Sequence, residues 1–253
     1  MTAIDHTPTI APAPRRVLNV MRLHVANPFP TLALPWLITA AIFAVNLAIW
    51  LMIANAAGGV DNLESDAFQY NGGISWIVFF MTVVAVQAMN LTFRFALGFS
   101  VTRRVYYVGT ALYFVALSLL YSLGITVLAA IERATDGWGL GAAFFAPWGL
   151  SSEPLLLVWF LYLMAMLLFF FLGAAVATVW VRWGAYGLYA FFIGLAFLVV
   201  GGAWLVTATD SWGDVGAFFA TTPLAQIAAW TLPVTLLCGL LGYVFLRKAT
   251  PQG

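Results

Sequence analysis

Six long apolar runs without a single charged residue constrain this chain more than any other feature of its sequence. Each run reaches the roughly 20 residues that an α-helix needs to cross the ~30 Å hydrocarbon core of a bilayer. The runs are residues 32–54, 73–93, 108–131, 154–181, 183–207 and 224–246, and none contains Asp, Glu, Lys, Arg or His. We therefore predict an all-α integral membrane protein with six transmembrane helices, residues 15–253 forming one transmembrane domain.

The composition excludes a water-soluble fold. Hydrophobic residues make up 64% of the 253 residues and charged residues 8%, against roughly 25% charged in soluble domains. A net charge of +1 gives no indication of nucleic-acid binding. The single cysteine, Cys238, lies in an apolar run and excludes both an intrachain disulfide and a cysteine metal site.

The charges between the runs are sorted by side. With six crossings, nine of the ten basic residues fall on the side of the two termini, and only Arg133 falls opposite. The acids show the reverse pattern, since only Asp5 joins the basic side. The positive-inside rule then predicts cytoplasmic termini.

Because Lys248 is the only lysine and alanine is abundant, we expect a bacterial plasma-membrane protein from a GC-rich genome.

The segment before the first run is expected to contain two parts. Residues 1–14 are polar and proline-rich and are predicted to be a disordered cytoplasmic tail. Residues 15–26 place Val17, Leu18, Met21 and Val25 at helical spacing, which favours a short amphipathic helix lying in the membrane interface. Its headgroup-facing residues would be Arg15, Arg16 and Arg22. The alternative is a frayed tail in which these arginines only set topology.

Two connections on the acidic side combine aromatic residues with glycine. Residues 136–154 and 210–223 each contain tryptophan and a pair of phenylalanines. Such segments either dip into the outer leaflet as a lid over the helices or form an aromatic belt that anchors helix ends.

Several chemistries are missing from the sequence. No ionisable residue lies inside a run, which disfavours a proton-coupled carrier. His6 and His24 have no metal-ligand spacing, and no cluster of titratable residues suits catalysis, so we predict neither an enzyme nor a metal site. A phosphate-binding loop of the G-x-x-x-x-G-K-[ST] kind is also absent, so no cofactor is expected in this chain.

Four amide side chains lie inside the apolar runs and are candidates for a substrate path. Gln87 and Asn90 are three residues apart and are expected to share a helix face. These amides either hydrogen-bond between helices or line a path for a substrate. The four residues are Asn46, Gln87, Asn90 and Gln226.

The connection between the second and third runs, about residues 94–107, carries the most distinctive pattern. Gly98 is a plausible helix stop and Ser100 a plausible N-cap, so a new helix is expected to begin near "VTRR". Arg103 and Arg104 would then project into the cytoplasm, with apolar and aromatic side chains around them. The predicted partner-binding residues are Gly98, Phe99, Ser100, Val101, Thr102, Arg103, Arg104, Tyr106 and Tyr107.

This pattern resembles the membrane subunits of type-2 ABC exporters, the ABC-type-2 permeases. The resemblance covers the order of elements along nearly the whole chain and a motif of about fifteen residues. The motif positions are Gly98, Ser100, Thr102, Arg103, Arg104, Tyr106, Tyr107 and Gly109.

In that family this connection is a coupling helix seated in a cleft of the ATP-binding subunit. The resemblance thus implies an ABC ATP-binding partner that holds ATP and Mg and a second permease subunit, identical or homologous. Apolar and aromatic spans with scattered amides favour an amphipathic or hydrophobic substrate. It also implies that residues 15–26 are the connecting helix and 210–223 the outer re-entrant segment. The segment 132–153 is longer than the corresponding segment of a minimal family member, which leaves its role open.

Two other interpretations stand beside this hypothesis. Arginines collect in any cytoplasmic connection to set topology, which is sufficient for Arg182 and Arg247 but does not explain the glycine, serine and aromatic residues beside Arg103 and Arg104. A non-transport membrane scaffold, assembly factor or immunity protein is the main alternative function, and a proton-coupled carrier is the third.

Overall fold

The computed structural model describes residues 13–247, and within that range it contains helices and connecting turns but no strand. Most of the predicted tail, including Asp5 and His6, and the basic residue Lys248 lie outside the described residues. The elements are α1 Ala13–His24, η1 Phe29–Ala33, α2 Leu34–Ala56, η2 Val60–Asn62, α3 Ser75–Gln87, η3 Ala88–Thr92, α4 Phe93–Gly98, α5 Arg103–Ala134, η4 Gly137–Gly141, η5 Leu150–Ser152, α6 Leu155–Ala208, α7 Trp212–Thr221, α8 Leu224–Ala229 and α9 Thr231–Arg247.

Five continuous helical stretches among the described residues are long and apolar enough to cross a membrane. They are Phe29–Ala56, Ser75–Gly98, Arg103–Ala134, Leu155–Ala208 and Leu224–Arg247. The fourth has 54 residues, which at 1.5 Å per residue spans about 80 Å. That is far more than one bilayer crossing needs, and it contains both the fourth and the fifth apolar runs.

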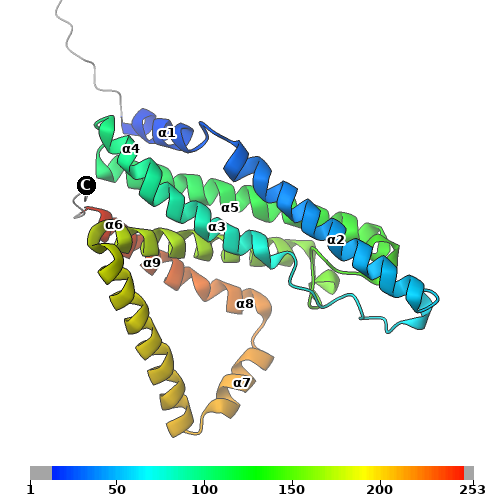
Figure 1. Ribbon diagram of the computed structural model, residues 1–253. Helices are drawn as coiled ribbons and strands as arrows, with labels where there is room; N and C mark the ends of the chain where they lie inside the picture. Colours follow the sequence, from blue (N-terminus) through cyan, green and yellow to red (C-terminus); the bar gives the residue numbers. More distant parts are fainter. Residues whose placement is uncertain (1–12, 248–253) are drawn as a thin grey trace, which may run out of the picture.

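The long helix α6 is broken at Gly184. This residue has φ 64° and ψ −151°, a conformation essentially restricted to glycine. Figure 1 shows the consequence: the chain reverses its path at this point, close to the end of α9. The break lies at the "RWG" sequence where the tight join between the fourth and fifth runs was predicted, so that prediction is confirmed.

The helices α3, α5, α9 and the first part of α6 form the packed bundle (Figure 1). Gly173 on α6 lets α3 approach closely, since a Cβ there would lie 2.7 Å from the Thr82 carbonyl oxygen. The Phe114 ring of α5 stacks on Phe170 of α6 with centroids 5.0 Å apart. Small residues and interleaved aromatic rings therefore hold these helices together, as van der Waals packing does inside membranes.

The second part of α6 and α7, residues 185–221, leave the bundle as a separate arm (Figure 1). Every side chain of this arm is exposed or half-buried in the described structure. We call this segment the splayed arm. Its apolar side chains therefore face the surroundings of the molecule rather than the bundle.

The N-terminal helix α1 is present where a helix was predicted before the first run. It lies against α5, and Val20 and His24 are its buried residues. Gly109 on α5 provides the space, because a Cβ at this position would lie 2.7 Å from Val20 Cβ. Leu18 and Val25 of the predicted apolar stripe are exposed, so the docked face around Val20 is a different one, and the position of this helix in the membrane interface stays a prediction.

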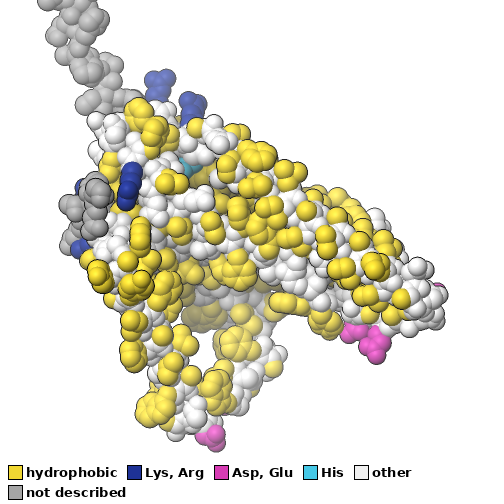
Figure 2. All heavy atoms as spheres, viewed as in Figure 1, with side chains coloured by type: hydrophobic (Ala, Val, Ile, Leu, Met, Phe, Trp, Pro, Cys, Tyr) yellow, Lys and Arg dark blue, Asp and Glu magenta, His cyan; other side chains and the backbone are white. Residues whose placement is uncertain are grey.

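The charged side chains are segregated at the surface. Figure 2 shows arginine side chains around α1 and the end of α9, and Asp and Glu at the far ends of the bundle and of the splayed arm. We call the first region the arginine-rich end; the elements that meet there carry Arg15, Arg16, Arg22, Arg94, Arg103, Arg104, Arg182 and Arg247. We call the far end of the bundle the acidic end, where the chain carries Asp61, Glu64, Asp66, Glu132, Asp136 and Glu153.

Candidate functional site

The turn between α4 and α5, residues 99–102, contains the predicted partner-binding motif. As predicted, α4 ends at Gly98. Ser100 adopts a left-handed φ of 59°, whereas an N-cap needs an extended backbone. Thr102 has that conformation, and its Oγ1 accepts a hydrogen bond from the Val105 N–H at 3.4 Å. The prediction of Ser100 as the cap is therefore wrong, because either side chain could cap and only the backbone selects Thr102.

The paired arginines have different surroundings. Arg103 is half-buried, and its guanidinium donates a hydrogen bond to the Arg247 carbonyl at 3.0 Å, which ties this turn to the end of α9. Arg104 is exposed. Arg104 is thus the member of the pair available to a partner, while Arg103 also holds two helix ends together.

Tyr106 and Tyr107 are buried in the bundle. The Tyr106 hydroxyl donates to the Ala88 carbonyl, and the Tyr107 hydroxyl donates to the Gly239 carbonyl. The expectation that these two tyrosines supply docking surface is corrected. Their polar tips instead join α5 to η3 and α9, as buried tyrosines usually do when a carbonyl is within reach.

A groove of about 480 Å³ lies between α1 and the α4–α5 turn. Phe99 is 69% exposed at this groove, and Arg16 contributes from α1. Arginine and aromatic residues above an apolar floor are the usual anchors of protein interfaces. The full lining is Arg16, Asn19, Val20, Leu23, Phe95, Ala96, Phe99, Ser100 and Val101.

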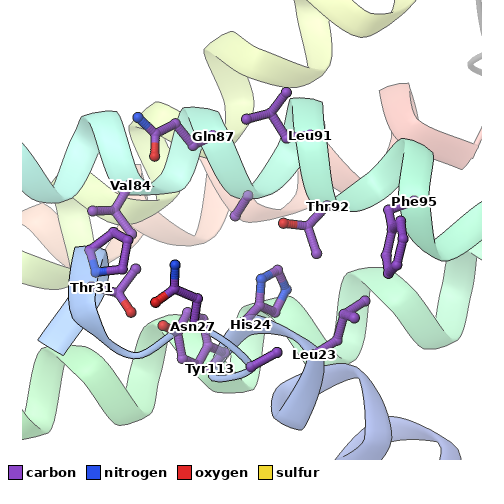
Figure 3. A pocket seen from close by; sticks show the side chains of 13 residues that line it. Leu23, His24, Asn27, Thr31, Val84, Gln87, Leu91, Thr92, Phe95 and Tyr113 are labelled. Atoms are coloured by element: carbon purple, nitrogen blue, oxygen red, sulfur yellow. The ribbon is translucent and has the colours of Figure 1, made fainter.

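A second cavity, of about 440 Å³, lies beside this groove (Figure 3). Its walls come from the α1–η1 segment and from α3, η3 and α4, and Tyr113 of α5 closes it. Within the described structure, no Asp, Glu, Lys or Arg side chain lines it. The lining residues are Leu23, His24, Ala26, Asn27, Pro30, Thr31, Val84, Gln87, Ala88, Leu91, Thr92, Phe95 and Tyr113.

His24 sits in this cavity in a defined protonation state. Burial lowers the pKa of its imidazole from the ordinary 6.5 to about 4, so the ring is neutral at pH 7. Its Nε2 lies 2.9 Å from the Thr110 hydroxyl, which also lies 2.9 Å from the Tyr106 carbonyl oxygen. A neutral imidazole has one nitrogen that donates and one that accepts, and the Thr110 hydroxyl can pair with either kind.

Two hydroxyl groups of the cavity lining have no partner other than each other. The Tyr113 and Thr31 hydroxyls are buried side by side, and neither makes a well-formed hydrogen bond to any other group within residues 13–247. Tyr113 itself is only 3% exposed, and its ring stacks on His24 with centroids 4.8 Å apart. A buried hydroxyl without a partner costs about 1–3 kcal/mol. Figure 3 shows the Asn27 and Thr31 side chains close to Tyr113 on one side of the cavity.

Two turns of π-helix flank the same cavity. The first, η1, contributes Pro30 and Thr31, and the second, η3, contributes Ala88, Leu91 and Thr92. A π-helical turn is rare and occurs frequently at functional sites, because it inserts an extra residue and re-aims the side chains. Both long walls of the cavity carry this uncommon geometry.

The structure does not bring the four predicted path residues together. Of the four, only Gln87 lines the cavity; Asn90 lies within the π-helical turn η3, where residues three apart no longer stack as they do in an α-helix. Asn46 donates to the Ile42 carbonyl of its own helix at 2.9 Å. Gln226 is exposed on α8. The expectation that Gln87 and Asn90 share one face is therefore corrected.

At the acidic end, Glu132 has a role that the sequence analysis missed. Its side chain is 2% exposed and accepts hydrogen bonds from Trp138 Nε1 and from the backbone N–H groups of Phe144, Phe145 and Ala146, at 2.8–3.3 Å. The segment 137–150, which we call the plug, is thereby pinned to α5. Within the sequence, the signal was an acid directly after an apolar run and directly before an aromatic segment.

The remaining observations limit the chemistry. Within the described chain, no three His, Cys, Asp or Glu side chains are placed to hold a metal ion. Comparison of the chain with known families, with curated proteins and with solved structures finds no match. The class that the fold itself defines is a multi-pass, all-helical membrane protein, with a groove and a neutral cavity at its arginine-rich end.

Proposed function

We propose that this chain is the membrane subunit of an ATP-driven ABC exporter. In this proposal it crosses a bacterial plasma membrane six times, with both termini in the cytoplasm. It works with a second permease subunit, identical or homologous, so that two halves enclose one path for an amphipathic or hydrophobic substrate. A separate subunit binds ATP and Mg and docks at the α4–α5 turn.

The topology of the proposal is supported by the break in α6. If Gly184 divides α6 into two crossings, five long helices provide six crossings and the two termini share a side. The arginines then collect on the side of the termini, which the positive-inside rule places in the cytoplasm.

The observation that carries the docking proposal is the groove between α1 and the α4–α5 turn. It combines exposed Phe99 with Arg16 on one side, and Arg104 is exposed a few residues further along the chain. An acidic cleft in a partner would complement these arginines and speed assembly, while the apolar floor would supply most of the affinity.

A rigid connection runs from this turn to the other end of the bundle. Thr102 caps α5, Arg103 ties the turn to α9, and the 32-residue helix α5 carries Glu132, which binds the plug, near its other end. Movement of the turn by a partner would therefore displace a helix that reaches both ends of the bundle. Such helix shifts are a common way of switching between two packed states.

The test uses the full chain co-expressed with a candidate ATP-binding subunit that carries Walker motifs. We expect the double variant Phe99→Ala/Arg104→Glu to lose at least about tenfold of the co-purified ATPase, because it removes the apolar anchor and reverses the charge. The matched control is Arg133→Glu, the same charge reversal on an exposed residue at the acidic end. If the ATPase still binds the double variant as it binds the control, the docking proposal is wrong.

A further inference from the structure

The cavity lined by His24 and Tyr113 has features that the docking proposal does not use. It is separate from the groove that holds Phe99 and Ser100, although Leu23 and Phe95 line both. Its volume of about 440 Å³ lies in the range of ligand sites, roughly 300–1,000 Å³. Seven of its thirteen lining residues are apolar, and the polar ones come from both walls: Figure 3 shows Gln87 and Thr92 across the cavity from His24 and Thr31.

The polar groups determine which chemistry would be complementary. The neutral imidazole of His24 has one nitrogen that donates and one that accepts, and Nε2 is the one that meets Thr110. The Tyr113 and Thr31 hydroxyls are buried side by side, and each can both donate and accept. A ligand group that can itself donate and accept would match all three side chains. A hydroxyl group and a primary amide have this ability, whereas a carboxylate cannot donate and an ammonium cannot accept.

The lack of charged side chains in the cavity also favours a neutral ligand group. Neither an acidic nor a basic side chain of the described chain lines it, so an ionic headgroup would be desolvated without a counter-charge. The apolar wall formed by Val84, Leu91 and Phe95 offers contact to a hydrocarbon chain. Leu91 and Phe95 are 69% and 56% exposed, so this wall opens to the surroundings of the molecule.

We propose that this cavity binds the uncharged, hydroxyl- or amide-bearing headgroup of a single-chain amphiphile, with His24, Tyr113 and Thr31 as its hydrogen-bonding residues and the α3–α4 face as the path of its chain. The site does not depend on an ATPase partner. It would operate in a transporter as a point of lateral entry from the membrane, and in any other membrane protein as a bound-lipid site.

The test uses the full chain in phosphatidylcholine nanodiscs. The probe is a 1-monooleoylglycerol analogue with a photoreactive diazirine in its acyl chain, and labelled peptides are mapped by mass spectrometry. We expect labelling within residues 23–31 and 84–95. Unlabelled 1-monooleoylglycerol should compete at least about tenfold better than oleate or oleylamine, which carry the same chain with a charged headgroup.

Three variants examine the site itself. Tyr113→Phe removes one hydroxyl and should weaken labelling several-fold. His24→Phe removes the imidazole and should also weaken labelling several-fold. Ala26→Trp fills the cavity from an exposed position, which keeps the test valid if a core variant fails to fold. The matched control is Tyr186→Phe, because Tyr186 is 85% exposed on the splayed arm.

The outcomes separate this proposal from the docking proposal. Loss of labelling in Ala26→Trp and in either polar variant, with the control unchanged, supports the site whether or not an ATPase binds. Equal competition by oleate or oleylamine overturns the neutral-headgroup assignment. Unchanged labelling in Ala26→Trp overturns the cavity as the binding site.

Discussion

The tetrapeptide Ala-Phe-Phe-Ala occurs twice in the chain, and the two copies have opposite environments. At residues 143–146 it lies in the plug, where Phe144 is 0% and Phe145 4% exposed. At residues 217–220 it lies in α7 of the splayed arm, where Phe218 is 46% and Phe219 60% exposed. Each phenylalanine pair has a similar edge-to-face geometry, with centroids 4.9 Å and 5.4 Å apart. The local sequence alone therefore does not decide burial.

The difference lies in the partners that the rest of the fold supplies. The plug copy is held through its backbone, by Glu132 from α5, by the Tyr162 hydroxyl from α6 and by the Asn71 amide. Its rings enter an aromatic cluster with Phe43 and Trp50 of α2. The arm copy satisfies its backbone within α7 and needs no outside partner. Backbone N–H and C=O groups outside a helix cannot stay without a hydrogen bond in an apolar environment. The hydrogen bonds to these groups therefore fix the plug in place.

The largest expected effect comes from removing the plug's anchor. Glu132→Ala leaves four buried N–H groups without an acceptor, and we expect a loss of at least about 4 kcal/mol of unfolding free energy. The matched change in the arm, Asp214→Ala, removes an exposed acid and should stay within about 0.5 kcal/mol. Titration with SDS in mixed micelles measures both. Equal effects of the two substitutions would contradict the conclusion that outside partners hold the plug but not the splayed arm.

A smaller effect is expected from the phenylalanines themselves. Phe144→Ala should cost about 3–4 kcal/mol, because it leaves a cavity among Phe43, Trp50 and Phe145. Phe218→Ala, the same change at the corresponding position of the arm, should cost under about 1 kcal/mol, since its ring is half exposed. The same SDS titration applies. A large cost at Phe218 would show that the arm packs on something that covers it in the membrane.

The smallest effect concerns the position of the arm. Gly184→Ala should cost about 1–3 kcal/mol, because φ 64° with ψ −151° is strained for any residue with a Cβ. The strain should shift the arm relative to α9. Spin labels at Val200 and Leu237, both exposed, would report a changed distance distribution, with Cys238→Ser as the background. The control Gly194→Ala has open space at that position and should leave the distances unchanged.

Much of the architecture could be predicted from the sequence. The six apolar runs are helical except for one or two residues in three of them, the join at 182–184 contains the break in α6, and α4 ends at Gly98. These features depend on local chemistry: apolar length, the conformational freedom of glycine and the sorting of charges. The helix before the first run was predicted for the same reason, because its periodicity is a local property.

The candidate sites were only partly predictable. The N-cap moved from Ser100 to Thr102, and the burial of Tyr106 and Tyr107 could not be seen from a pattern of aromatic residues beside arginines. No role was predicted for His24 or Glu132, yet each is buried. Each owes its environment to residues far along the chain, Thr110 for His24 and the plug for Glu132.

The sequence by itself determined that this is a helical membrane protein, where its helices begin and end to within a few residues, and which ends carry the arginines. Only the tertiary structure decided which apolar faces meet protein and which stay exposed. The physical reason is that lipid tails are as apolar as a helix bundle, so hydropathy places a helix in the membrane without orienting it. Orientation comes instead from close approach at Gly109 and Gly173 and from hydrogen bonds such as those to Glu132.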